Sequence, residues 1–386
     1  MKRIALIMLC LLLCSCAGTI TPPTSEATTT EATAEAVTTE TVTTEAPETE
    51  APEPVIPPSN VLQFDNKKAG IYNYCPSVIT EADGTRYIYY CTNRDSYKVI
   101  DYVGCRKGTP NADGSYSWSE EKLVLEPSPE GAWDAHHTCD PSVIKGSFSY
   151  GGTEYSYLMA YLGCTSYDSQ DNKIGLAVAN DPMGPFIKVG DKPAVDFKLD
   201  PSVTVFQWGV GQASLVSIDK GGKVWMIYTR GDKNGTRVVM TECDFSNLDA
   251  PVIGAEKRVV TGGLANLNGG NDFMNNADFA YDAVNDRFYC VSDCHPNPGD
   301  EPNYIGSHVR VNYLKGSDLT KGVWRSVLQI GPDKTDFPRN HNAGLARDEY
   351  GHLCTADFIT VYYTMSETGS QSLWSYRIYE YSIKLK

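Results

Sequence analysis

A short phrase recurs five times along this 386-residue chain, about every 66 residues, and this repeat limits the possible folds more than any single residue does. Each copy reads as a small apolar strand, a tight turn and a second strand rich in aromatic residues. Turn-forming pairs such as Asp83-Gly84 and Gly221-Gly222 separate the two strands and favour β-hairpins. The five copies begin at Cys75, Asp140, Gln212, Asp278 and Asn342.

A third strand follows the hairpin in each copy, as at residues 174–178 and 237–240. Several short strands in a unit that repeats at a fixed spacing are typical of propellers and other all-β arrays. Five units of this length use the chain from about residue 61 to its end. The sequence therefore predicts an all-β domain over residues 59–386, folded as a five-bladed β-propeller.

The first 18 residues resemble a lipoprotein signal peptide. Met1-Lys-Arg gives a charged start, and the apolar run at residues 4–13 is shorter than the roughly 20 residues that span a bilayer. Leu13-Cys-Ser-Cys16 places a small residue before a cysteine, as lipoprotein processing requires. We expect lipidation of Cys16 and an extracellular protein anchored to the cell membrane; the alternative is an ordinary secretory signal cut after Ala17.

Residues 19–58 differ in composition from the rest of the chain. They contain 13 Thr, eight Glu and many Pro, with no Lys or Arg. Such a segment cannot bury a core, so we expect a disordered, self-repelling stalk. The formal charge of the whole chain is -15, and the domain stays acidic without the stalk. Nucleic acid is therefore excluded as a partner, whereas neutral polysaccharide is compatible.

Three of the 12 cysteines lie in the signal region, and nine remain in the domain. An odd number leaves at least one thiol unpaired. Cys91, Cys164 and Cys290 end equivalent second strands, where we expect them to act as small buried apolar residues. The spacing Cys-x-x-Cys is missing, and the adjacent His136 and His137 would point to opposite faces of a strand, so no metal is predicted.

The first strand of each propeller blade lines the central channel, so the residues that begin the five copies should converge on one opening. Four of them are polar or ionisable where packing alone would favour Val or Ala. Asp140 and Asp278 have a second interpretation, in which they only cap inner strands by accepting backbone amides. Aromatic faces and paired polar groups suit sugars, and the predicted substrate-binding residues are Trp133, His137, Trp208, Gln212, Arg230, Asn276, His341, Asn342 and Cys75.

Asp140-Pro-Ser-Val-Ile, which precedes a turn and a Tyr-rich strand, and residues 174–186 together resemble family 43 glycoside hydrolases, the arabinanases, arabinofuranosidases and xylosidases. This resemblance implies a propeller whose blade-one Asp is the general base, whose blade-two Asp orients it, and whose blade-three Glu is the general acid. Asp140 matches the blade-two residue. Cys75 and Gln212 stand at or near the positions of the base and the acid, and neither side chain performs that chemistry.

Because Cys75 and Gln212 cannot act as the base and the acid of family 43, we consider two functions. The first is an inverting glycoside hydrolase acting on arabinose- or xylose-containing polysaccharide or oligosaccharide, with Asp140 and Asp278 as a rebuilt acid and base pair and Asp134 in reserve. The second is a non-catalytic carbohydrate-binding lipoprotein. A surface adhesin for protein is a third class. We expect a monomer without a cofactor, and calcium is not predicted because no run of acidic ligands resembles a calcium loop.

Overall fold

The structure is a computed structural model that describes residues 55–65, 68–166 and 171–385. The predicted signal peptide, the lipidation site Cys16 and all but the last four residues of the predicted stalk lie outside these ranges. Within the described ranges, no helix has both the length and the apolar character that crossing a membrane demands.

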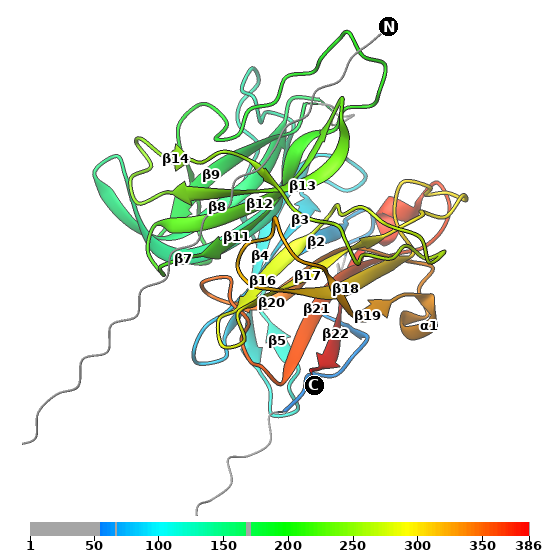
Figure 1. Cartoon of the computed structure of the whole chain (residues 1–386). Coiled ribbons are helices and arrows are strands. Elements are labelled where there is room, and N and C mark those ends of the chain that lie inside the picture. The colour runs from blue at the N-terminus through cyan, green and yellow to red at the C-terminus, as the bar shows by residue number, and fades with distance from the viewer. Residues whose placement is uncertain (1–54, 66–67, 167–170, 386) are drawn as a thin grey trace, which may run out of the picture. The chain divides into compact units, whose positions relative to one another are not determined.

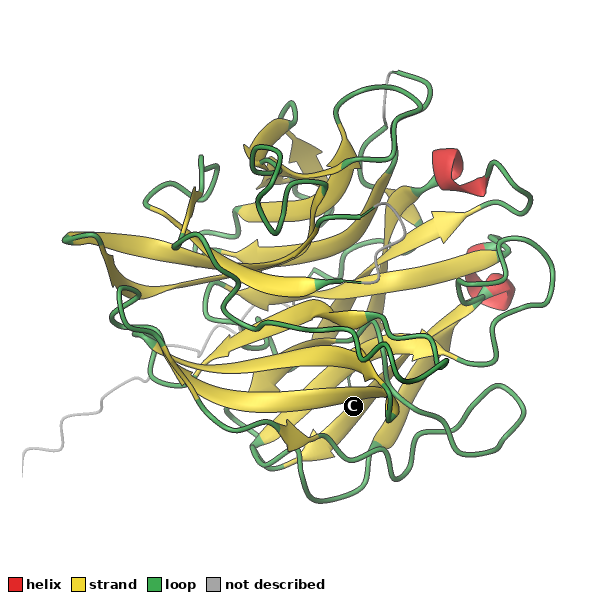
Figure 2. Ribbon diagram, turned by 90° about the horizontal axis from the view of Figure 1, so that it is seen from above, coloured by secondary structure: helices red, strands yellow, loops and turns green. Residues whose placement is uncertain are grey.

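Almost all regular structure is β, as Figure 2 shows, and it forms five antiparallel blades, which confirms the predicted fold. Blade one contains β2 (Asn73–Thr80), β3 (Arg86–Asn93), β4 (Asp101–Pro110), β5 (Tyr116–Trp118) and β6 (Lys122–Leu125). Blade two contains β7 (His137–Tyr150), β8 (Thr153–Cys164), β9 (Lys173–Ala179) and β10 (Ile187–Lys188). Blade three contains β11 (Gly209–Ser217), β12 (Lys223–Asp232), β13 (Gly235–Asp244), β14 (Val252–Ile253) and β15 (Lys257–Arg258).

Blade four contains β16 (Asp278–Asp282), β17 (Arg287–Cys294), β18 (His308–Lys315) and β19 (Arg325–Ile330). Blade five contains β20 (Arg339–Asp348), β21 (Phe358–Ser366), β22 (Arg377–Lys384) and β1 (Val61–Leu62). Two helical turns, α1 (Pro332–Thr335) and η1 (Ser372–Ser375), lie in connections next to blade five. Figure 1 shows β14 of blade three at the upper left and β19 of blade four on the right, next to α1.

The ring closes in two ways. Inner strand β2 pairs in parallel with inner strand β20, so that blades one and five share one nine-stranded sheet. At the outer edge, β1 pairs antiparallel with β22, Val61 opposite Glu380 and Leu62 opposite Tyr379. The outer edge of blade five is thus completed by a strand that precedes blade one in the sequence.

The hydrophobic core lies between neighbouring blades. The largest cluster joins Ile144 and Leu158 of blade two to Leu215 and Tyr228 of blade three, all of them fully or almost fully buried. Alternating apolar residues on both faces of each blade make this packing possible, since each sheet is covered on two sides. The blades therefore hold one another rather than folding around one central core.

Arg347 of β20 fills the centre of the propeller and is fully buried. Its guanidinium donates to the hydroxyls of Ser77 on β2 and Ser142 on β7, at 3.3 Å each. It also donates to the carbonyls of Leu215 on β11 and Phe279 on β16, at 3.0 and 3.3 Å. One side chain thus ties the inner strands of all five blades together.

Candidate functional site

Five residues in left-handed backbone conformation form a ring at the start of the inner strands. Their φ angles lie between 43° and 53°, and they are Cys75, Asp140, Gln212, Asn276 and Asn342. In four blades the pairing with the second strand shifts at this residue and the next, which is a β-bulge. Non-glycine residues rarely adopt this conformation, and five equivalent cases mark a site that the fold holds under strain.

The ring corrects the sequence alignment of blade four. The residue equivalent to Asp140 is Asn276, whereas Asp278 is two residues further along and is equivalent to Ser142. The register slipped because Asp278 looks like the Asp that begins the second copy, whereas the other copies have Ser or Gly at this position. Asp278 lies one layer deeper than the ring, where its carboxylate is 3.3 Å from Arg347 Nη1 and accepts hydrogen bonds from the Ser214 hydroxyl and the Leu345 amide.

Asp140 is buried at the start of β7, and it lines a small cavity of about 30 Å³ in the channel. Burial raises the pKa of its carboxyl to about 6, although a hydrogen bond from the Cys75 thiol opposes the shift. Cys75, Asp278, Gln212 and Asn276 line the same cavity. A carboxyl group with this pKa exchanges its proton near neutral pH, which suits proton transfer.

The structure corrects the expectation for Cys91. It forms a disulfide with Cys139, 48 residues away, instead of serving as a small buried apolar residue. Cys164 and Cys290 form no disulfide among the described residues and are buried, as expected. The disulfide packs against Leu162 and beside Trp208, directly next to the ring.

Three predicted site residues line neither the channel cavity nor the wide cavity above it. Trp133 stacks on Tyr161 with ring centroids 5.7 Å apart, and His137 Nδ1 lies 2.9 Å from an Asp101 carboxylate oxygen. Arg230 forms ion pairs with Glu256 and Asp232. These three side chains are engaged by neighbouring residues and border neither cavity. Their role in substrate binding stays a prediction.

Asp134 is also tied to a local partner. Its carboxylate lies 2.5 Å from Lys188 Nζ and accepts a hydrogen bond of 2.9 Å from the Tyr161 hydroxyl. It borders neither cavity. The role of Asp134 as a reserve acid or base stays a prediction, and so does the role of Asp278.

A wide cavity of about 880 Å³ lies above the ring. It shares Gln212, Asn276 and Asn342 with the channel cavity, so the two are adjacent. Predicted residues Trp208 and His341 line it as well. The aromatic part of its wall consists of Tyr74, Phe206, Trp208, Phe273, Tyr304 and Tyr376. Aromatic rings beside amides and imidazoles match the apolar faces and hydroxyl edges of sugars.

His341 is the most buried ionisable group of this wall. Neither ring nitrogen has a hydrogen-bond partner of ordinary geometry among the described residues, although the Thr364 backbone lies near enough to favour the protonated ring slightly. Burial, helped by the charge of Arg339, lowers the pKa of His341 to about 3. A neutral imidazole is therefore held at the cavity wall with its polar atoms unsatisfied.

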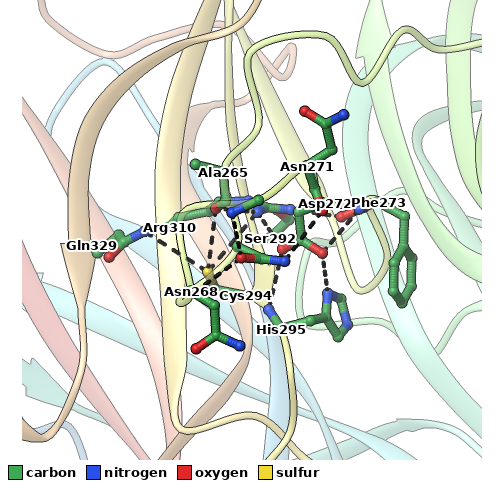
Figure 3. A network of polar contacts seen from close by, with 12 residues as sticks. Ala265, Asn268, Asn271, Asp272, Phe273, Ser292, Cys294, His295, Arg310 and Gln329 are labelled. Atoms are coloured by element: carbon green, nitrogen blue, oxygen red, sulfur yellow. Dashed lines mark hydrogen bonds and ion pairs between the residues drawn. The ribbon is translucent and has the colours of Figure 1, made fainter.

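The sequence reasoning missed a polar network in blade four, drawn in Figure 3. Asp272 Oδ1 lies 2.9 Å from His295 Nδ1, and Asp272 Oδ2 lies 2.5 Å from Arg310 Nη1. Burial would raise the pKa of Asp272, but the hydrogen bonds from His295 and the charge of Arg310 outweigh it and lower the pKa to about 2. Asp272 is therefore an ion that orients the imidazole.

His295 borders the wide cavity and stacks on Phe273, with ring centroids 3.9 Å apart. Since Asp272 occupies Nδ1, the nitrogen left for a ligand is Nε2. Asp293, two residues earlier, was missed as well. Burial raises the pKa of Asp293 to about 6, although hydrogen bonds from the Asn276 side chain and the Asn342 amide oppose the shift. The only sequence signal was the cluster Asp293-Cys-His295 at the end of a second strand.

Comparisons with known proteins agree with this fold. No protein-family model matches the sequence, and no curated protein sequence matches it. Solved structures do match. A family 117 glycoside hydrolase from Zobellia galactanivorans has a TM-score of 0.53 at 11% identity, over 84% of this chain and 88% of that one.

Two further matches are a thermostable family 43 glycoside hydrolase and a GH43_1 enzyme from Xanthomonas citri complexed with xylotriose. The first has a TM-score of 0.51 at 15% identity, over 84% of this chain and 93% of that one. The second has a TM-score of 0.50 at 14% identity, over 82% of this chain and 88% of that one. The chain therefore has the fold of the propeller glycoside hydrolases, and the resemblance seen in the sequence is confirmed at the level of fold.

Proposed function

We propose that this protein is a glycoside hydrolase acting on arabinose- or xylose-containing polysaccharide or oligosaccharide by an inverting acid and base mechanism. In this proposal it works as a monomer outside the cell, held to the membrane by a lipid on Cys16 and carried on the stalk of residues 19–58. The solved neighbours support the choice of sugars, because one of them was determined with xylotriose.

The wide cavity carries the proposal. Its volume of about 880 Å³ suits several sugar rings, and its wall combines six aromatic side chains with the amides of Gln212, Asn275, Asn276 and Asn342. Phe206 and Tyr304 are more than half exposed at its rim. Exposed aromatic rings beside a polar cavity are a platform on which an extended glycan can lie.

Hydrolysis with inversion needs one group that protonates the leaving oxygen and one that takes a proton from water. We assign Asp140 to this pair because its pKa of about 6 lets it exchange a proton near neutral pH. His295 is our candidate for the second group, since it borders the wide cavity and Asp272 orients its ring. Asp278 and Asp134 are weaker candidates because Arg347 and Lys188 already hold their carboxylates.

A non-catalytic carbohydrate-binding protein is the second candidate. The observation that favours it is the ring itself, where Cys75 and Gln212 occupy the positions that carry the base and the acid in the family that the sequence resembles. Gln212 is also engaged, since its amide contacts Asn276. Binding requires the wide cavity and its aromatic wall but no proton transfer.

The test is sugar release from arabinans and xylans by the full chain, with Asp140→Asn and Trp208→Ala alongside. We expect Asp140→Asn to lower kcat at least about 100-fold with little change in affinity, because acid or base catalysis contributes 10²–10⁴-fold. Trp208→Ala should weaken glycan binding about tenfold, which is about 1.4 kcal/mol.

Asp113→Asn is the matched control, because this carboxylate is exposed on the loop before β5. It should leave both kcat and affinity unchanged. If the unchanged protein binds glycan but releases no sugar, and Trp208→Ala loses this binding, the protein is a non-catalytic carbohydrate-binding protein. Neither binding nor release of any glycan would reject both.

A further inference from the structure

Three cysteines and one carboxylate meet beside the ring. The ligand atoms of Cys75, Cys91 and Asp140 all lie within 4.8 Å of one another, and Cys91 is bonded to Cys139. The Asp140 carboxylate oxygen Oδ1 lies 3.7 Å from Cys91 Sγ and 3.3 Å from Cys139 Sγ. The group joins blade one, through Cys75 on β2 and Cys91 on β3, to the start of β7 in blade two.

The separation of 3.7 Å between Asp140 and Cys91 Sγ matches that of two ligands of one metal ion, and Cys139 Sγ reaches it by moving away from Cys91 when their bond is broken. In a tetrahedral zinc site with Zn–S of about 2.3 Å and Zn–O of about 2.1 Å, two ligand atoms are about 3.5–3.8 Å apart. Cys75 and Asp140 also line the channel cavity of about 30 Å³, which gives their side chains room to turn. Three thiolates and a carboxylate are a soft donor set that selects zinc over calcium or magnesium.

We propose that Cys75, Cys91, Cys139 and Asp140 form a zinc site when the disulfide is reduced. A dithiol reductant supplies two electrons and two protons to the Cys91–Cys139 bond, which yields two thiols and leaves the reductant as a disulfide. One Zn²⁺ then displaces the three thiol protons, and Asp140 supplies the fourth ligand as a carboxylate. Oxidation of Cys91 and Cys139 removes two of the four ligands, so zinc binding depends on the redox state.

Several features of the surroundings support this assignment. The Asp140 amide donates to Cys91 Sγ at 3.0 Å, and the Tyr74 hydroxyl lies 3.1 Å from Cys139 Sγ. Such contacts orient sulfur ligands and stabilise their negative charge. Asp140 belongs to both sites, so bound zinc would remove it from the proton transfer proposed above. The zinc site itself does not depend on that function.

The experiment is a zinc titration of the full chain against a chromophoric chelator, with and without prior reduction by a dithiol. The reduced protein should bind one zinc ion per chain at this site, and Cys75→Ser and Asp140→Asn should each weaken binding more than about 100-fold. Loss of a residue that merely orients a metal ligand already costs 10- to 100-fold. Co²⁺ in place of Zn²⁺ should give the strong thiolate charge-transfer absorption of tetrahedral cobalt.

Cys243→Ser is the matched control, since this free buried cysteine lies in blade three. It should bind zinc like the unchanged protein, and circular dichroism should confirm that every variant is folded. Zinc uptake that is equal before and after reduction, or that survives Cys75→Ser and Asp140→Asn, would overturn the proposal. So would reduced protein that binds no zinc in competition with the chelator.

Discussion

Replacement of Arg347 by methionine is expected to lower the free energy of unfolding by about 3–5 kcal/mol, because removing one partner of a buried ion pair leaves the other uncompensated. Asp278 would lose its cation, and the hydroxyls and carbonyls that accept from Arg347 in three other blades would lose their donor. Denaturant unfolding at pH 7 measures the change.

A double-mutant cycle separates the ion pair from the packing. Arg347→Met combined with Asp278→Asn should cost less than the sum of the two single changes, by about 1–3 kcal/mol, since the residues are in direct contact. Arg325→Met, at an exposed position of β19, is the control and should change stability by less than about 0.5 kcal/mol. If Arg347→Met unfolds at the same denaturant concentration as the unchanged protein, Arg347 does not join the blades energetically.

The second large effect is expected at Glu380 of β22, where Gln should stabilise the protein at pH 8 by up to about 3 kcal/mol. Burial raises the pKa of Glu380 to about 7, although the charge of Arg86 and hydrogen bonds from Tyr362 and Gln63 oppose the shift. Glu380 is almost fully buried, and its Oε2 is 3.9 Å from Arg86 Nη1 without a hydrogen bond. Ionisation of this carboxylate therefore costs the fold free energy.

The sign of the pH dependence follows from the raised pKa. Between the unfolded pKa, near 4.5, and the folded pKa, near 7, the folded state binds more protons than the unfolded state. The contribution of Glu380 to stability is therefore largest below about pH 4.5, falls as the pH rises to 7, and stays low above it. Glu380→Gln should match the unchanged protein at pH 4 and exceed it at pH 8.

Thermal unfolding of both proteins from pH 4 to pH 8 tests this expectation. Glu130→Gln, at an exposed position, controls for the loss of one negative charge and should follow the unchanged protein at every pH. An equal or lower stability of Glu380→Gln at pH 8 would mean that the pairing with Arg86 outweighs the cost of burial.

Most of the fold was predictable from the sequence, because each blade repeats the same local pattern of strand and turn residues. Turn residues such as Gly84 and Gly351 do adopt positive φ angles, and a residue in left-handed conformation begins the repeated phrase in four of the five blades. The prediction for blade four failed because Asp278 stands where the other copies have Ser or Gly, and it resembles the Asp that begins the second copy. Two alignments of blade four then fitted the apolar pattern equally well. The left-handed conformation of Asn276 shows which of them is correct.

The site was less predictable, because its decisive contacts join segments from different parts of the chain. Asp272 and His295 are 23 residues apart, and the Cys91–Cys139 disulfide spans 48. No local pattern encodes such pairings. Trp133 and Trp208 looked alike in sequence, yet one stacks on Tyr161 and the other lines the wide cavity, because the partner of each is set by blade packing.

The pairing of β1 with β22 gives the chain a definite order of assembly. Blades one to four are built from consecutive segments, so each has all its strands as soon as its own residues have been made. Blade five needs strands from two distant segments, Val61–Leu62 and Arg377–Lys384, and is therefore complete only once Arg377–Lys384 has been made. Until β22 has been made, Val61–Leu62 has no strand to pair with, and the outer edge of the ring stays open.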